Sequence, residues 1–241
     1  MSKHGFAMKF ILCGKRKRQM IEKIKYIIFD MDGTLIDSLG YWKYLWGELG
    51  KKYLGIDGFM ADTETDRTVR TITLTEASEF LRDKYFPMAS AEDIYDFAIE
   101  ILKDHYGRRV SAKEGTLEFL KRLRDGGVKM CVASATEPGY INYALERCGI
   151  DSFFEFVISC SEVGAGKEKP DVFLEALRRL GGDLSEACVF EDSFIALETA
   201  QAAGFMTVGV FDENNYNQDR LRAASDFYVA KGMTVMDVLG E

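Results

Sequence analysis

The residues best suited to chemistry in this chain of 241 residues stand just after short apolar runs. Each run is followed by acidic, hydroxyl or basic side chains, and these are Asp30, Asp32, Ser134, Lys167, Glu191 and Asp192. Four carboxylates that converge at one crevice repel one another by about 4 kcal/mol per pair at ~4 Å, for an effective dielectric constant near ~20. A divalent cation is therefore expected in the site, and a ligand set made only of oxygens favours Mg²⁺ over zinc or copper.

This combination of side chains suits the transfer of a phosphoryl group. Asp30, nearest the end of the first run, can attack phosphorus and form an aspartyl-phosphate, which divides one difficult displacement into two easier ones. Asp32 can protonate the leaving oxygen and then take a proton from water in the second step. Lys167 and the metal would together neutralise the phosphoryl group. Its oxygens would be held by Ser134 and by the backbone N–H groups around Thr34 and Ala135.

The elements that must position these residues alternate between buried strand and amphipathic helix. Strands are expected at 26–29, 128–133, 156–159, 188–190 and 205–210, and helices at 117–124, 137–148, 171–180 and 194–203. Strands separated by helices imply βαβ units and hence a parallel sheet covered on both faces, a Rossmann-like three-layer α/β core. Ligands bind at the carboxyl ends of such strands, which is where the chemical residues stand.

Residues 40–109 have a different pattern, because apolar side chains recur there with helical spacing and no strand pattern intervenes. The first stripe is Trp42, Leu45, Trp46, Leu49 and Tyr53, and its aromatic members are interpreted as core rather than as a platform for substrate stacking. The pattern predicts a small all-helical domain inserted between the two parts of the α/β core, 25–39 and 110–241.

Residues 1–24 are predicted to be an extension outside the core, with the true start of the protein at Met20. The basic run at 15–18 follows the apolar segment 6–13, the wrong order for a secretory signal. A tether to nucleic acid or lipid through this run remains the alternative.

Composition excludes several classes of function. The net charge of −8 argues against a broad surface for nucleic acid or anionic membrane, and no apolar stretch approaches the ~18 residues of a membrane span. The five cysteines never form a CxxC pair, which favours reduced thiols in a cytoplasmic protein. A small phosphorylated metabolite is the expected partner; the oligomeric state is left open, and a monomer fits.

Four segments resemble, in order, the motifs of the haloacid dehalogenase superfamily, in its phosphatase and β-phosphoglucomutase-like branch. They are 29–38 (FDMDGTLIDS), 132–136 (VASAT), 166–171 (GKEKPD) and 190–193 (FEDS), and the resemblance covers nearly everything from Lys25 onward. It implies Asp30 as nucleophile, Asp32 as acid and base, and a helical cap between the first two motifs. It also implies Mg²⁺ on the side chain of Asp30, the backbone oxygen of Asp32 and the acids Glu191 and Asp192.

The resemblance predicts a Mg²⁺-dependent phosphatase of a small metabolite. A sugar-phosphate mutase is the first alternative, disfavoured because the insert lacks the Leu-Lys-Gly turn followed by Arg that such mutases usually show. A binding protein without turnover is the second. Arg67 and Arg70 are candidates to contact another anionic group of the substrate. Two assignments stay open: Lys167 is preferred to Lys169 for the phosphate, and Asp192 is a safer metal ligand than Glu191.

Overall fold

The computed structural model describes residues 23–69 and 74–240, without the side chain of Arg67. Most of the predicted N-terminal extension, with Met20 and the basic run at 15–18, lies outside these residues. Ile24, assigned to that extension, is 9% exposed and belongs to the core. The chain divides into two compact units: 38–109 is one, and the segments on either side of it form the other.

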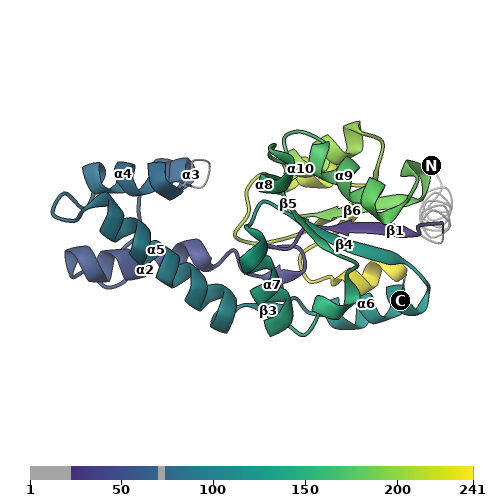
Figure 1. Cartoon of the computed structure of the whole chain (residues 1–241), viewed down its shortest axis with the longest axis horizontal. Coiled ribbons are helices and arrows are strands. Elements are labelled where there is room, and N and C mark those ends of the chain that lie inside the picture. Colours follow the sequence, from purple (N-terminus) through teal and green to yellow (C-terminus); the bar gives the residue numbers. More distant parts are fainter. Residues whose placement is uncertain (1–22, 70–73, 241) are drawn as a thin grey trace, which may run out of the picture. The chain divides into compact units, whose positions relative to one another are not determined.

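The larger unit contains a parallel sheet of six strands in the order β5-β4-β1-β6-β7-β8 (Figure 1). These strands are β1 (Tyr26–Phe29), β4 (Lys129–Ser134), β5 (Val157–Ser159), β6 (Ala187–Glu191), β7 (Met206–Val210) and β8 (Phe227–Val229). Since all six run the same way, their carboxyl ends share one edge of the sheet. The predicted α/β class is confirmed, and each predicted core strand and helix is present with its ends shifted by at most one residue.

Helices cover both faces of this sheet because both faces of its strands are apolar. On one face, Ile28 and Val189 pack with α9 (Asp171–Leu180) and α10 (Phe194–Ala202). On the other face, Phe29 meets Phe119 of α6 (Thr116–Asp125) with their ring centroids 6.3 Å apart. Figure 1 shows α9 and α10 on one side of the sheet and α6 and α7 on the other. The remaining helical segments of this unit are α7 (Pro138–Arg147), η2 (Asp151–Phe153), α8 (Cys160–Val163), η3 (Leu184–Glu186), α11 (Gln218–Ala223) and η4 (Val235–Leu239).

The predicted loop after β5 begins as a helix, α8. Ser159 and Glu162 form a reciprocal capping box that stabilises this single turn, a local signal that the apolar spacing does not reveal. Gly164 then ends the turn in a left-handed conformation and sends the chain toward Lys167.

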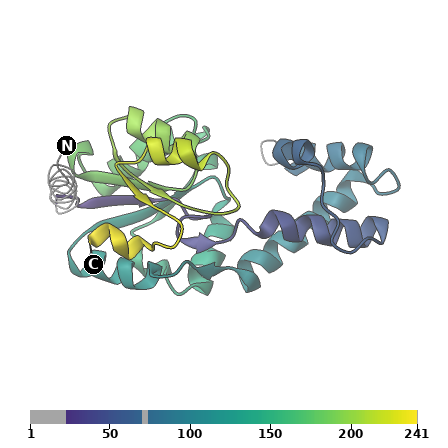
Figure 2. The same ribbon diagram turned by 180° about the vertical axis from the view of Figure 1, so that it is seen from behind.

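The smaller unit is helical in its described residues. It contains α2 (Tyr41–Leu54), α3 (Thr63–Val69), α4 (Leu74–Lys84), α5 (Ala91–Asp104) and the π-helical turn η1 (His105–Arg109). Figure 2 shows its helices from behind, in purple to teal. The interpretation of the aromatic stripe as core agrees with the packing, because Trp46 is fully buried and its Nε1 donates to Asp66 Oδ1 at 2.7 Å. Trp42 and Tyr53 are partly buried against the same cluster.

Two short strands mark where the chain leaves the larger unit and returns to it. β2 (Ile36–Asp37) and β3 (Ser111–Ala112) pair antiparallel, with Ile36 opposite Ala112. The N–H of Lys113 extends the pairing by donating to Leu35 O at 2.9 Å. Both connections to the helical unit are therefore fixed to one another within the larger unit.

Among the residues that the structure describes, no helix is long and apolar enough to cross a bilayer. Four of the five cysteines are described, and all four are free thiols.

Candidate active site

Asp30 lies directly after β1, at the carboxyl edge of the sheet, and is 6% exposed. Its N–H donates to Phe190 O at 2.9 Å, which holds it beside β6. The chain then turns on the carbonyl of Met31, which accepts from the N–H groups of the residues at 34, 35 and 36. Gly33 occupies this turn with φ +79°, a left-handed conformation that disfavours any side chain.

Lys167 reaches the same point from the loop after α8. Its ammonium group contacts the carboxylate of Asp30 and donates to Glu191 Oε1 at 2.6 Å. The Lys167 side chain is 10% exposed, whereas Lys169 is exposed. The structure therefore brings Lys167, and not Lys169, to the acidic residues.

Glu191 and Asp192 differ in how much of each carboxylate is already engaged. Glu191, 1% exposed, accepts from Lys167 through one oxygen and from the N–H of Ser193, at 2.7 Å, through the other. Asp192 Oδ2 accepts from Asn215 Nδ2 at 2.7 Å, while the hydroxyl of Thr34, at 3.5 Å, is the only donor to Asp192 Oδ1 among the described residues. Asp192 thus keeps the more available oxygen for a further ligand.

Asp30, Glu191 and Asp192 form a buried cluster that fits a divalent cation. Each offers one carboxylate oxygen, and these oxygens lie within 4.8 Å of one another. Three ionised carboxylates beside the single ammonium of Lys167 would leave a buried net charge of −2, which is costly without a counterion. The charge and the all-oxygen donor set both match Mg²⁺.

The proton affinities of this cluster are strongly perturbed. Burial raises the pKa of Asp30 above its ordinary value, against the opposing charge of Lys167, and raises that of Glu191 to about 7. Burial and the neighbouring acids also raise the pKa of Asp192 well above its ordinary value. Burial disfavours the ammonium form of Lys167, but Asp30 and Glu191 outweigh it and raise its pKa. The lysine therefore remains a cation.

Asp32 has a different environment from the other predicted metal residues. Its side chain is not part of the three-carboxylate cluster; Asp32 Oδ2 accepts from Thr136 Oγ1 at 2.8 Å. Asp32 is half-buried, on the turn that follows Asp30. The carboxylate of Asp30, the predicted nucleophile, thus lies inside the three-carboxylate cluster, whereas that of Asp32, the predicted acid and base, lies outside it.

The residues predicted to hold phosphoryl oxygens are placed unequally. Ser134, 1% exposed at the end of β4, accepts from the N–H of Thr136 at 3.0 Å, and Ala135 follows it on the surface. Ser134 does not cap α7, whose N-cap is Glu137. The N–H of Thr34, predicted to donate to a phosphoryl oxygen, instead donates to Met31 O at 3.3 Å within the turn.

The two arginines considered for substrate specificity lie wholly or partly outside the described residues. Arg67 belongs to α3 by its backbone, and its side chain lies outside the described part of the chain. Arg70 lies outside the described residues altogether.

Two partners of the site were not singled out from the sequence. Thr136 lies within the segment 132–136 that carries the resemblance, but no function was attached to it. Asn215 lies in the loop 211–217 after β7. The signal that would have found this loop is its position, because it follows a parallel strand at the edge of the sheet where the acids gather.

Comparison with known proteins agrees with this geometry. The family model of the haloacid dehalogenase-like hydrolases matches residues 24–204. The chain is 26% identical over 185 residues to the bifunctional riboflavin kinase/FMN phosphatase of Arabidopsis thaliana, covering 76% of this chain and 48% of that protein. It is 25% identical over 223 residues to the pyrophosphatase PpaX of Bacillus pumilus, covering 90% of this chain and 97% of that protein.

A solved structure shows the same fold. It is a Thermotoga maritima protein provisionally assigned as a β-phosphoglucomutase, with a TM-score of 0.75, 23% sequence identity, and coverage of 90% of this chain and 97% of that one. The chain spans about half the length of the Arabidopsis relative and nearly all of the Bacillus relative. Since the family model matches most of its length, the chain belongs to the haloacid dehalogenase-like hydrolases.

Proposed function

We propose that this hydrolase is a Mg²⁺-dependent phosphatase that hydrolyses a small phosphorylated metabolite through an aspartyl-phosphate on Asp30. One observation carries the proposal: the buried carboxylate of Asp30 lies in a cluster with two further acids and in contact with Lys167. The names of the relatives, an FMN phosphatase and a pyrophosphatase, support a phosphate ester or anhydride as substrate.

In this mechanism Asp30 attacks phosphorus, and Asp32 donates a proton to the leaving oxygen. Lys167 neutralises part of the charge on the phosphoryl oxygens, and the hydroxyl of Ser134 donates a hydrogen bond to one of them. Asp32, now ionised, takes a proton from the water that attacks the phosphoaspartate and so frees Asp30. The two steps together return phosphate and an alcohol, with every proton accounted for.

Asp30, Asp192 and the backbone oxygen of Asp32 are proposed to hold Mg²⁺, and Glu191 would support the site by holding Lys167. Both oxygens of Glu191 are already engaged, which favours this supporting position. The bound ion would supply positive charge to the phosphoryl oxygens and offset the repulsion between them and the acids.

The test is hydrolysis of p-nitrophenyl phosphate with and without Mg²⁺. Mg²⁺-dependent release of phosphate is expected, and a panel of phosphorylated metabolites would then identify the substrate. Absence of turnover in both conditions, with Asp30→Asn binding phosphate as well as the parent, would favour a binding protein. Conversion of glucose 1-phosphate to the 6-phosphate with a bisphosphate primer would favour the mutase instead.

The two lysines of the segment 166–171 give a matched comparison. Lys167→Met is expected to lower kcat by about 100-fold, because it removes a cation aimed at the transferring group. Lys169→Met, an exposed substitution of the same type, is expected to leave kcat within about twofold. Steady-state kinetics of both variants, with thermal melting as the check on folding, measure this. A larger loss in Lys169→Met would reverse the assignment of the two amines.

Mg²⁺ is expected to stabilise the protein more at about pH 8 than at about pH 5.5. In the metal-free protein Glu191 has a pKa of about 7, above its ordinary value of 4.5, because of burial. The folded state therefore binds more protons than the unfolded state between these values, and the metal-free protein loses stability as pH rises through them. Mg²⁺ favours the ionised acids, so its binding strengthens over the same range.

Thermal melting at one fixed Mg²⁺ concentration, about 100 times the Kd at about pH 8, would show a gain of about 2.7 kcal/mol at that pH and a smaller gain at about pH 5.5. Asp192→Asn is the control and should lose most of this gain. An equal gain at both pH values would contradict the assignment of the cluster as the metal site.

A further inference from the structure

The loop after β7 contacts the proposed metal site through one side chain. Asn215 Nδ2 donates to Asp192 Oδ2 at 2.7 Å and to the carbonyl oxygen of Asp192 at 2.9 Å. One amide group therefore fixes both the backbone and the carboxylate of this acid. It occupies Oδ2, whereas Oδ1 accepts only from the hydroxyl of Thr34, at 3.5 Å, among the described residues.

Asp212 organises this loop from within. It is 4% exposed, and its Oδ1 accepts from the N–H of Asn214 at 2.8 Å. Its carbonyl oxygen accepts from the N–H of Asn215 at 3.2 Å and from Gln218 Nε2 at 3.0 Å. The position of the Asn215 amide thus depends on where Asp212 is held.

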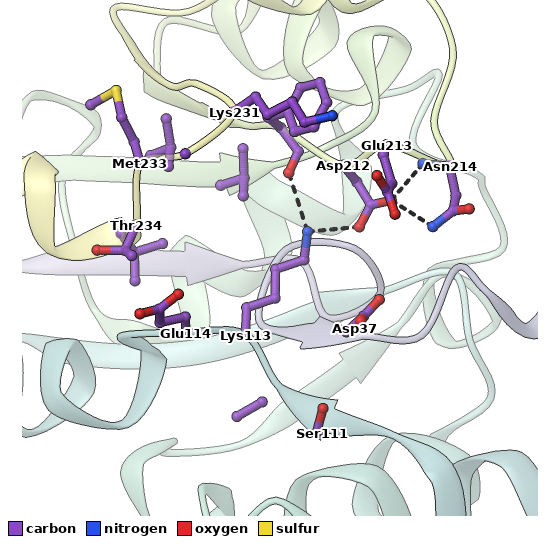
Figure 3. A pocket seen from close by; sticks show the side chains of 16 residues that line it. Asp37, Ser111, Lys113, Glu114, Asp212, Glu213, Asn214, Lys231, Met233 and Thr234 are labelled. Atoms are coloured by element: carbon purple, nitrogen blue, oxygen red, sulfur yellow. Dashed lines mark hydrogen bonds and ion pairs between the residues drawn. The ribbon is translucent and has the colours of Figure 1, made fainter.

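Lys113 holds Asp212 from the opposite side. Its Nζ lies 2.7 Å from Asp212 Oδ2 and donates to Phe211 O at 3.2 Å, and its side chain is 19% exposed. Figure 3 shows Lys113 reaching toward Asp212, with Asn214 on the far side of that carboxylate. The backbone of Lys113 is itself fixed to Leu35 beside the strand pair β2/β3.

This ion pair borders a pocket of about 370 Å³ within the larger unit. Lys231 lines the same pocket, is exposed, and lies with its Nζ 5.9 Å from the centre of the Phe211 ring. Among the described residues Lys231 forms no ion pair, so it offers a lysine of the same pocket without the contact to Asp212.

We propose that Asn215 and Lys113 are positioning residues that set the Mg²⁺ affinity of the site, Asn215 by orienting Asp192 and Lys113 by fixing the loop through Asp212. This inference rests on the metal site of the proposed function. Groups that orient a metal ligand typically contribute about 10- to 100-fold in metal affinity, because an unrestrained carboxylate must be ordered when the ion binds. Lys113 acts two contacts further away, through Asp212 and then Asn215, and its contribution is correspondingly smaller.

The test is calorimetric titration of the full chain with Mg²⁺ alone, without substrate. Asn215→Ala is expected to raise the Kd by about 10-fold or more, and Lys113→Met by about fivefold. Lys113→Arg, which can still pair with Asp212, should restore most of the affinity. Lys231→Met is the matched control and should change the Kd by less than about twofold.

Thermal melting without metal separates positioning from loss of structure. If Lys113 acts by positioning, Lys113→Met binds Mg²⁺ more weakly than Lys231→Met even when the two variants melt at the same temperature. Its kcat then needs more Mg²⁺ to reach its maximum, while KM at saturating Mg²⁺ is unchanged. If Lys113→Met does not fold, Asp212→Asn carries the same expectation, since it removes the ion pair and keeps an acceptor for Asn214. Equal Mg²⁺ affinities in Lys113→Met, or Asp212→Asn, and Lys231→Met would overturn the role of Lys113.

The outcome also separates this inference from the proposed function. A chain that binds Mg²⁺ with the expected differences and hydrolyses no phosphate supports the inference and overturns the function. If the chain hydrolyses phosphate esters but substitutions at Asn215 and Lys113 leave its Mg²⁺ affinity unchanged, the proposed function is supported and the inference is overturned.

Discussion

Asp30→Asn is expected to lower kcat for every phosphorylated substrate by at least about 10⁴-fold, because the amide cannot form the covalent intermediate. The asparagine keeps the size of the side chain and an acceptor for Lys167, so the variant is expected to fold. Rapid acid quenching followed by mass spectrometry should find a phosphoryl adduct on the peptide that contains Asp30 in the parent, and no adduct in the variant.

Asp37→Asn is the matched control for this substitution. Asp37 lies in the same segment, is exposed, and stands at the end of β2. The activity of Asp37→Asn should stay within about twofold of that of the parent. If Asp30→Asn keeps more than a small fraction of the parent activity, or if the adduct maps to another residue, Asp30 is not the nucleophile.

Asp32→Asn is expected to separate the two chemical steps. p-Nitrophenolate leaves without prior protonation, so Asp30 should still be phosphorylated when p-nitrophenyl phosphate is the substrate. Hydrolysis of the phosphoaspartate needs a base, and loss of a general base typically lowers the rate of such a step by about 10²- to 10⁴-fold. Stopped-flow absorbance should therefore show one burst of p-nitrophenol, close to the enzyme concentration, followed by very slow turnover.

An alkyl phosphate tests the other half of the role of Asp32. Its leaving group requires a proton, so Asp32→Asn should give no burst with such a substrate. The variant keeps an oxygen that can accept from Thr136 Oγ1, and Thr136→Val removes the donor while leaving the acid in place. Unimpaired turnover of the alkyl phosphate by Asp32→Asn would rule out Asp32 as the general acid.

The five strands and four helices expected in the larger unit were predictable because their signals are local, whereas β8 and α11 were not predicted. Burial of a parallel strand requires a continuous apolar run, and helix ends are set by neighbours such as Pro138 and Gly181. The polar residues after β1, β4 and β6 could be assigned to one edge for the same reason, since parallel strands end together. The helix α8 was missed because a capping box, not apolar periodicity, stabilises it.

The sequence alone determined the fold class, the helical character of the insert, and the kinds of side chain that gather at the sheet edge, since each depends on residues close together along the chain. Tertiary structure alone decided which of those side chains meet. Lys167 contacts an aspartate 137 residues away, Thr136 bonds to Asp32, and Asn215 to Asp192. Such contacts depend on the strand order and on the conformations of the loops. A shift of a few ångströms in a loop breaks a hydrogen bond, and the spacing of residues along the chain does not determine the positions of loops so closely.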